Sequence, residues 1–413
     1  MAVITVLSVD ETTKEVTPTG VADFVNQQAI VRFSLKQNVG SQDLVARELK
    51  VQVGTGSRIY TATLASPSSE VFLAIPEVSN KQVTLTATGD DGVFTRVVSG
   101  VTFTKGQYYD IGVKMTCTTP YVNLAKVSNN ITVTDGQVLA GTLGQAYQIS
   151  IEDGATVTLK NATIDLSGTI TAFAGITCLG TATINLEGTN TVKAYRNYYP
   201  AIQAGPAETT LTIGGSGSLT VTGAPNPNAT SVAIGCNYGG TCGHLCFVGG
   251  SIIATGGYRC VAIGASHGTS GKTSICGNIT ITGGHIIATG GNFSPAIGCS
   301  HSYSANSSRC GNITISGGTV EATGGVQSAA IGCSNYGSCG DIIISGGTGT
   351  ATKGAEMGNV GADCAIGQSN IDGYGSTGTI TIAVKTYYNG STGTFISDEE
   401  KAFLMQNSIS WGD

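Results

Sequence analysis

The chain is poor in charge, in proline and in long apolar runs. Of its 413 residues only 11% are charged and 9 are proline. Disorder requires low hydrophobicity and high net charge, whereas this chain is 40% hydrophobic with a mean hydropathy of +0.16, so it is expected to fold. The scarcity of proline excludes collagen, and no run of about 18 apolar residues is present to form a membrane-spanning helix.

Basic patches are also lacking. The formal net charge is −6 and the pI is about 5.2, without the clustered lysine and arginine that nucleic-acid binding requires, so we expect no nucleic-acid partner. Glycine, by contrast, is abundant: 60 residues, about twice the ordinary share. A glycine inside a helix costs about 1 kcal/mol, so this composition argues against an ordinary helical enzyme and indicates a folded, turn-rich β protein.

Glycine and charge are distributed unevenly along the chain. Residues 1–117 hold 9 of the 60 glycines but 21 of the 46 charged residues, and the other 296 residues hold 51 glycines and 25 charges. This shift predicts a boundary near Cys117–Pro120. The expected domains are 1–117, a repeat domain 118–396 and a C-terminal cap 397–413.

The first domain alternates apolar and polar residues in runs separated by glycine, asparagine and aspartate. Four runs have the two-residue period of a half-buried strand and predict an antiparallel β-sandwich: 29–35, 49–53, 83–87 and 108–115. The stretch VTFTKGQYYDIGVKM at 101–115, with AIVRFSLKQN upstream, resembles the fimbrillin-like β-sandwich domains of surface proteins from Bacteroidales. The resemblance implies an extracellular or outer-membrane location, with membrane contact only through a lipid-anchored N-terminus that lies outside this chain.

The second domain is a repeat array. The tripeptide Ala-Ile-Gly, once Ala-Ile-Gln, recurs every 29 to 35 residues, beginning at Ala201, Ala233, Ala262, Ala296, Ala330 and Ala365. Sequences such as GNITITGG (277–284) and HIIATGG (285–291) recur between these tripeptides. Each unit therefore predicts three short strands separated by glycine turns, which is typical of a parallel β-helix. A propeller is the alternative, but its blades need four strands and about 40 residues.

The array extends beyond its most regular repeats. The strand periodicity of 131–143, 147–166 and 176–195 predicts less regular first coils, and the capping box of Ser397 and Glu400 predicts a short helix that closes the last coil. Residues 147–385 resemble the repetitive, carbohydrate-binding-like β-helical domains of gut bacterial surface proteins, which implies the fold and brings no catalytic motif. The prediction is an all-β protein: an N-terminal antiparallel β-sandwich, a right-handed parallel β-helix and a short C-terminal capping helix.

Most of the twelve cysteines fall into two columns of the repeat. The column after the Ala-Ile-Gly strand holds Cys178, Cys236, Cys299 and Cys333, with Ala204, Ala265 and Gln368 in other coils. The column before the Gly-Asn-Ile strand holds Cys242, Cys276, Cys310 and Cys339.

Three interpretations of these columns stay open. Exchange with alanine favours buried, stacked thiols. Export favours loop disulfides, which would leave Cys276 unpaired and join Cys236–Cys242, Cys299–Cys310 and Cys333–Cys339. The third is a zinc site, whose ligand types are present at an unusual spacing in Cys236, Cys242, His244 and Cys246.

Carboxylates are too scattered for the active site of a β-helix lyase or hydrolase, which needs clustered acidic or basic residues. Residues 118–396 hold 11 aspartates and glutamates, and their best group, Glu356, Asp363 and Asp372, is more simply explained as solvated loop charge. The four histidines show no triad pattern. We therefore expect no catalytic residue, no metal and no cofactor.

The loops after Ala-Ile-Gly are the candidate binding surface, because their asparagine, histidine, serine and tyrosine side chains suit sugar hydroxyls and sugar rings. A second aromatic group in the loop before Ala201 could extend this surface. The predicted ligand-binding residues are Tyr198 and Tyr199 of that loop, with Asn237, Tyr238, His267, His301, Tyr303, Asn335 and Tyr336. The alternative is ordinary polar loop composition, with tyrosines covering the apolar edge of the coils. A threonine column (Thr255, Thr289, Thr323) would suit an ice-binding face, but glycine pairs interrupt it.

These features predict an exported cell-surface protein that acts as a non-catalytic adhesin or glycan-binding module. Its expected partner is a glycan or another ligand on a host or bacterial surface. A β-helix polysaccharide lyase or hydrolase is one alternative, and a purely structural stalk or fimbrial component is another.

Overall fold

The computed structural model describes residues 6–9, 16–18, 27–167, 172–195, 198–224, 230–357, 362–369 and 375–412. The chain divides into two compact units, Met1–Val122 and Asn123–Asp413. Strands β1 (Val6–Val9) and β2 (Val16–Pro18) form a separate antiparallel pair. No helix within the described ranges has the length and apolar character needed to cross a bilayer.

The first unit is a seven-stranded sheet wrapped around one core. Its strand order is β5-β4-β7-β8-β9-β3-β6, and the two edge strands β5 and β6 contact each other. Alternate residues, such as Val31, Phe33 and Leu85, lie in one buried cluster, as a two-residue period requires. The strands are β3 (Gln28–Gln37), β4 (Ala46–Val53), β5 (Ile59–Ser68), β6 (Glu70–Pro76), β7 (Val78–Gly89), β8 (Gly92–Phe103) and β9 (Tyr108–Pro120).

Neighbouring strands in this sheet are antiparallel, except that β3 and β9 pair in parallel. The four predicted runs correspond to β3, β4, β7 and β9. Strands β5, β6 and β8 were not predicted. In β5 the reason is visible, because its side chains are all exposed or half-buried and so show no apolar alternation.

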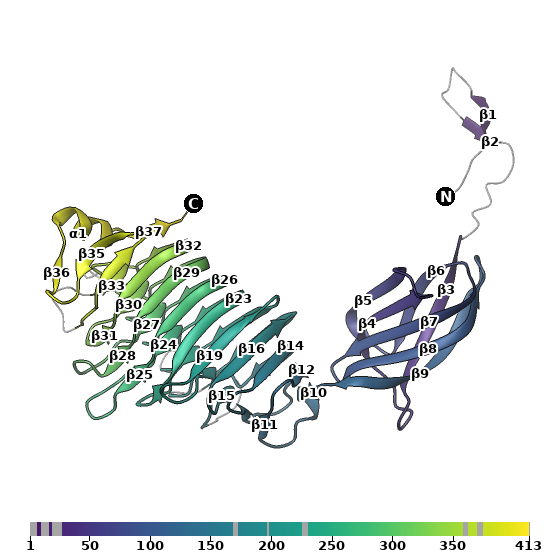
Figure 1. Cartoon of the computed structure of the whole chain (residues 1–413), viewed down its shortest axis with the longest axis horizontal. Coiled ribbons are helices and arrows are strands. Elements are labelled where there is room, and N and C mark those ends of the chain that lie inside the picture. The colour runs from purple at the N-terminus through teal and green to yellow at the C-terminus, as the bar shows by residue number, and fades with distance from the viewer. Residues whose placement is uncertain are drawn as a thin grey trace. The chain divides into compact units, whose positions relative to one another are not determined.

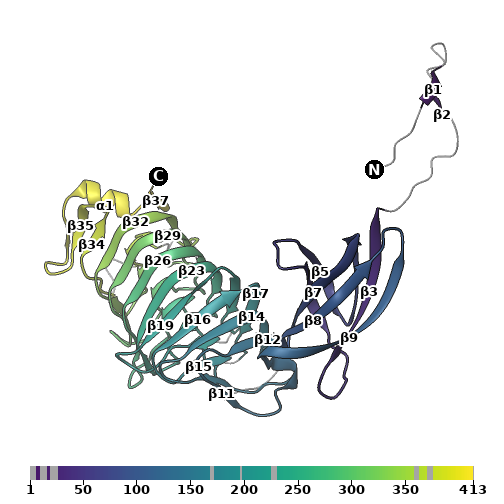
Figure 2. The same ribbon diagram turned by 45° about the vertical axis from the view of Figure 1, so that its right-hand side comes forward.

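The second unit is a parallel β-helix with three sheets along its length (Figure 1). The long-strand sheet contains β10 (Val122–Asn123), β12 (Val138–Thr142), β14 (Thr156–Asp165), β16 (Ala182–Glu187), β17 (Thr189–Lys193), β19 (Thr210–Gly215), β20 (Ser218–Thr222), β23 (His244–Thr255), β26 (Ile279–Thr289), β29 (Ile313–Thr323), β32 (Ile342–Thr352) and β34 (Ile380–Ile382). Figure 2 shows its central strands stacked side by side. The 3₁₀ helix η1 (Leu124–Lys126) precedes the first coil.

The other two sheets consist of short strands. The Ile-Gly sheet contains β11 (Ile131–Val133), β13 (Ile149–Ile151), β15 (Ile176–Cys178), β18 (Ile202–Gln203), β21 (Ile234–Gly235), β24 (Ile263–Ala265), β27 (Ile297–Cys299), β30 (Ile331–Cys333) and β33 (Ile366–Gln368). The cysteine sheet contains β22 (Thr241–Cys242), β25 (Ser274–Cys276), β28 (Ser308–Cys310) and β31 (Gly337–Cys339).

The Ala-Ile-Gly motif is explained by stacking in the Ile-Gly sheet. Ile297 pairs in register with Ile331, and both are fully buried in the apolar column of the core. Gly298 has φ +133°, and a Cβ atom there would lie 1.9 Å from the carbonyl oxygen of Gly332 in the next coil. Only glycine permits this backbone conformation and this approach.

The long strands differ from the prediction of three short strands separated by glycine turns. The segments GNITITGG and HIIATGG belong to one strand, β26, with Gly283 and Gly284 inside it. Between β26 and β29 the pairing skips these glycines, passing from Ile281↔Ile315 to His285↔Thr319. Both strands pass over three residues at this point, so the glycine pair lies within one long strand without changing its register, and in four coils the third side is the unpredicted cysteine sheet.

A ladder of side-chain acceptors joins successive coils just before the long strands. Nδ1 of His244 accepts the backbone N–H of Asn278 at 2.9 Å. Oδ1 of Asn278 accepts the N–H of Asn312 at 2.9 Å, and Oδ1 of Asn312 accepts that of Asp341 at 2.9 Å. Oδ1 of Asp341 accepts the N–H of Thr379 at 2.7 Å. This acceptor ladder explains the recurring Gly-Asn and Gly-Asp pairs, since a side chain at the glycine would collide with it.

The C-terminal cap contains the predicted helix and three strands that were not predicted. Its elements are β35 (Lys385–Asn389), β36 (Thr394–Phe395), α1 (Asp398–Leu404) and β37 (Ser408–Trp411). The Ser397 side chain accepts the N–H of Glu400, but the Glu400 carboxylate pairs with Lys385 at 2.6 Å. Strand β37 pairs antiparallel with β32 and buries Ile409 and Trp411, which extends the long-strand sheet beyond its last coil.

Candidate functional site

The loops on both sides of the Ile-Gly strands fold over the outer face of that sheet. Alternate side chains of a strand point to opposite faces, yet residues Ala262–Ala265 are all buried. The outer face of the sheet is therefore covered as well as the inner face. Serines join the two loops: Oγ of Ser300 accepts the N–H of Val261 at 2.9 Å and donates to the carbonyl of Ala265 at 2.7 Å. These loop serines are therefore structural and buried, and they do not form part of a polar binding surface.

A row of rings crosses these loops on four successive coils. The centroids of Tyr198 and Tyr238 are 4.6 Å apart, and Tyr238 stacks on His267 at 5.7 Å with 17° between the planes. His267 meets Tyr303 edge to face at 5.1 Å. Tyr198 and Tyr303 are 46% and 59% exposed, whereas His267 is 6% exposed. The rings at the two ends of the row are therefore accessible to solvent, and the imidazole between them is buried.

This row lines a groove of about 270 Å³, here called the aromatic groove. Its lining residues are Tyr198, Thr230, Tyr238, Tyr258, Arg259, His267, Thr269 and Tyr303. The hydroxyl groups of Tyr238 and Thr269 lie 2.8 Å apart and fix that tyrosine ring. Flat ring faces beside fixed hydroxyls can hold a ligand with one apolar face and a polar rim.

Arg259 is the cation of the aromatic groove. Its Cζ lies 5.1 Å from the ring centroid of Tyr258, 5.3 Å from that of Phe293 and 5.2 Å from that of Tyr303, within the range of cation–π attraction. Lys272 places its Nζ 5.5 Å from the ring centroid of Tyr238. The basic side chains of one coil thus flank the row of rings.

The histidines of this region are neutral at pH 7. Burial lowers the pKa of His301 to about 4, and the positive charge of Arg259 opposes its protonation further. Burial also lowers the pKa of His267, with a smaller contribution from Arg259. Nδ1 of His267 donates to the carbonyl oxygen of His301 at 2.8 Å, which holds the imidazole against Tyr238.

The structure brings four of the nine predicted ligand-binding residues into the aromatic groove: Tyr198, Tyr238, His267 and Tyr303. The other five are not among its lining residues: Tyr199, Asn237, His301, Asn335 and Tyr336. Tyr258 and Arg259 were missed because they lie in the loop before Ala262, and the loop before Ala201 was the one preceding loop from which residues were predicted. The signal that could have found them is the pair of basic residues in one coil, Arg259 and Lys272.

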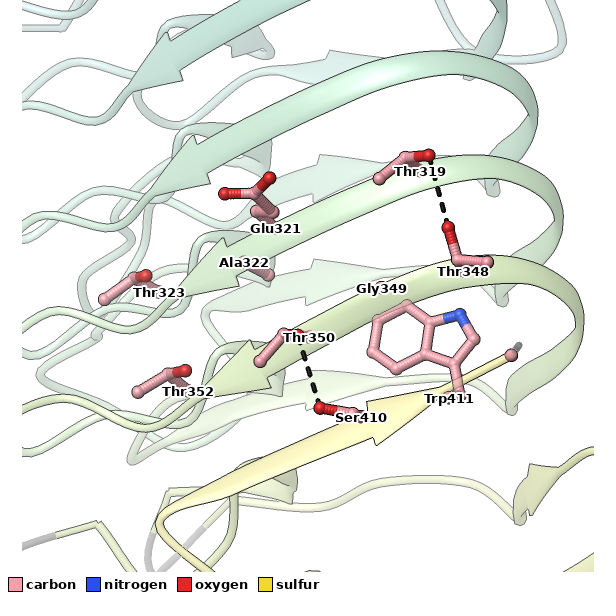
Figure 3. A pocket seen from close by; sticks show the side chains of 11 residues that line it. Thr319, Glu321, Ala322, Thr323, Thr348, Gly349, Thr350, Thr352, Ser410 and Trp411 are labelled. Carbon is pink, nitrogen blue, oxygen red and sulfur yellow. Dashed lines mark hydrogen bonds between the residues drawn. The ribbon is translucent and has the colours of Figure 1, made fainter.

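A second groove, of about 510 Å³, lies over β29, β32 and β37. The hydroxyl groups of Thr319 and Thr348 lie 3.2 Å apart, and those of Thr350 and Ser410 lie 3.3 Å apart. Figure 3 shows both pairs, with the Trp411 ring beside Gly349. These hydroxyl groups already bond each other across neighbouring strands. Trp411 is the one aromatic residue that lines this groove, whereas the aromatic groove is lined by four tyrosines and a histidine.

The predicted threonine column runs along the outer surface of the long-strand sheet. Thr255, Thr289 and Thr323 are in register from coil to coil. The neighbouring outward column is irregular, since it holds Ile253, Ile287 and Glu321 in the same coils. This surface therefore lacks the two uniform hydroxyl columns that an ice-binding face would need.

Several carboxylates of the β-helix accept backbone N–H groups or pair with bases. Asp135 accepts the N–H of Thr156, and Asp153 accepts that of Thr181, each at 2.8 Å. The ion pairs are Lys160–Glu187 at 2.8 Å, Lys193–Asp165 at 2.8 Å and His285–Glu321 at 3.1 Å. Of the group singled out in the sequence, Glu356 is exposed and Asp372 lies outside the described residues.

All twelve cysteines are free thiols in the structure. The two columns are in register, and where they meet the thiol of Cys299 contacts those of Cys310 and Cys333, which both contact Cys339. Cys276, which loop disulfides would leave unpaired, contacts Cys242.

The residues of the zinc interpretation do not converge on one point. His244 heads the acceptor ladder, so its Nδ1 is already engaged by the backbone of the next coil. Within the described ranges, no three histidine, cysteine, aspartate or glutamate residues are grouped so as to hold a metal ion.

Two segments, 279–301 and 313–335, match the model of the Beta helix repeat family. Each runs from the start of a long strand, β26 or β29, through the following Ile-Gly strand into its outer loop. This match and the parallel sheets support a β-helix domain. No curated protein and no solved structure matches the chain.

Proposed function

We propose that the β-helix is a non-catalytic glycan-binding module of an exported cell-surface protein. The observation that carries this proposal is the row of Tyr198, Tyr238, His267 and Tyr303, which line one groove although they come from four coils. Sugar rings pack on aromatic faces and bond neighbouring hydroxyl groups, and here Thr269 lies beside Tyr238. A rigid β-helix holds such a row in place without an ordering step on binding.

The cell-surface location rests on the first unit. Residues 101–115, which span the end of β8 and most of β9, carry the resemblance to fimbrillin-like domains of Bacteroidales surface proteins. A protein built in this way would present the β-helix to glycans on a host or on another bacterium, as an adhesin does. The scattered, already bonded carboxylates support a role in binding without catalysis.

The test is a glycan array followed by isothermal titration with the full chain. Tyr238→Ala should weaken binding of the selected glycan about tenfold, since stacking on one aromatic ring contributes about 1–1.5 kcal/mol. Tyr336→Ala is the matched control, because this half-buried loop tyrosine does not line the groove, and it should bind as wild type.

Three outcomes would contradict the proposal. Release of unsaturated or reducing ends would favour a polysaccharide lyase or hydrolase. Equal weakening by Tyr238→Ala and Tyr336→Ala would remove the aromatic groove as the site. Wild-type protein that binds no glycan would favour a structural stalk or fimbrial component.

A further inference from the structure

The aromatic groove contains a guanidinium group with no acidic partner. Arg259 takes part in none of the ion pairs among the described residues. Its Nε atom is buried without a hydrogen-bond partner, and none of the eight lining residues is a carboxylate. Arg259 is half-buried, and charges that are partly removed from water are usually paired, so an anionic ligand in the groove would supply the partner.

The surrounding residues hold Arg259 in one place. Three aromatic rings lie around its Cζ at 5.1 to 5.3 Å. Its backbone has φ +57°, and the equivalent residues of other coils, Tyr198, Phe293 and Gln327, also have positive φ, so a turn that recurs in the repeat sets the position of this side chain. A guanidinium fixed in this way loses little conformational entropy when an anion binds it.

The groove is locally positive in a chain whose net charge is −6. Arg259 supplies the charge, and Lys272 lies over the ring of Tyr238, the central tyrosine of the row. The neutral imidazoles of His267 and His301 neither add to this charge nor cancel it. An anion that enters the groove therefore meets attraction from two bases and no facing carboxylate among the lining residues.

We infer that the aromatic groove binds an acidic saccharide, whose ring packs on Tyr238 and whose carboxylate pairs with Arg259. The inference rests on the proposed glycan-binding function and narrows its ligand to sugars that carry a carboxylate, such as uronic or sialic acids. A carboxylate can accept two parallel hydrogen bonds from a guanidinium, which selects both charge and orientation. Lys272 would add attraction without this orientation, because an ammonium group acts as a point charge.

The experiment compares matched acidic and neutral probes by isothermal titration. Sialyllactose is titrated against lactose, and trigalacturonate against galactotriose, with wild type, Arg259→Gln and Arg259→Lys. We expect at least one acidic probe to bind wild type tenfold or more tightly than its neutral partner, because charge-assisted hydrogen bonds are the stronger class. Arg259→Gln should abolish this preference, so that the acidic and the neutral probe bind with similar affinity, and Arg259→Lys should keep part of it.

The outcomes separate the two proposals. If neutral probes or neutral glycans on the array bind and the acidic probes bind no better, the glycan-binding function stands and the acidic ligand is refuted. If no glycan binds wild type, both proposals fail. A preference that survives in Arg259→Gln would also refute the inference. Far-UV circular dichroism checks that each variant folds. If Arg259→Gln does not fold, the acidic and neutral probes are compared with Arg259→Lys.

Discussion

Substitution of Gly298 by alanine tests the packing of the Ile-Gly sheet. A Cβ atom at this position would lie 1.9 Å from the carbonyl oxygen of Gly332, whereas real Cβ contacts essentially never fall below 3.0 Å, so the coils must separate by about 1 Å. This movement would disrupt the bonds that Ala296 and Ile297 donate to the carbonyl of Ala330, at 2.9 and 3.1 Å, each worth about 1 kcal/mol. The φ of +133° adds about 1–3 kcal/mol of strain. We expect Gly298→Ala to lower the free energy of unfolding by about 3–5 kcal/mol.

The matched control is Gly271→Ala. Gly271 also has a positive φ, +82°, but a Cβ atom there would have nothing within 4 Å, so only backbone strain of about 1–2 kcal/mol is expected. The assay is urea unfolding, followed by far-UV circular dichroism and by the fluorescence of Trp411, the single tryptophan of the chain. Equal losses of stability in the two variants would refute the argument from close packing.

Three further predictions follow from the ladder, the cysteines and the buried histidine. Asn312→Ala should cost about 1–3 kcal/mol in urea unfolding, because the N–H of Asp341 loses its acceptor, whereas Asn312→Asp keeps an oxygen there and should cost much less; equal costs would contradict the ladder. Native protein should expose only Cys117 and Cys246 to iodoacetamide, since the other ten cysteines are buried, and mass spectrometry after unfolding without reductant should find all twelve alkylated; fewer would indicate disulfides. Burial lowers the folded-state pKa of His301 from 6.5 to about 4, so stability should fall as pH drops from about 6.5 to 4, where the unfolded state binds about one more proton; calorimetry should show a shallower fall for His301→Gln, and an unchanged slope would contradict it.

The stacking of coils can be predicted from the sequence because each repeat has the same residue at the equivalent position. Ile297 and Ile331 occupy equivalent positions of the tripeptide, and the structure pairs them in register. The path of the chain between these positions is harder to predict from the sequence. The pair Gly283-Gly284 has the composition of a turn, yet parallel pairing on both sides keeps it within β26. The cysteine strands are only two or three residues long, too short for an apolar pattern to predict them.

The candidate site is predictable only where its residues follow the repeat. Tyr238 and His267 come shortly after Ala-Ile-Gly and could be aligned by eye. Arg259 precedes the tripeptide, and it reaches the same groove because two loops fold over one sheet, a tertiary arrangement that local sequence does not encode. His301 was expected at the surface for its polar type, but burial among its neighbours keeps it neutral.

The acceptor ladder gives the β-helix a direction of growth. Each rung is made by a side chain of one coil and a backbone N–H of the coil after it, as Asn278 does for Asn312. During synthesis, a finished coil therefore presents an empty acceptor to the segment that emerges next, and the new coil completes one rung while it opens another. Because the positions of these acceptors fix where the next strand begins, the register of the array can be transmitted from coil to coil in the order of translation.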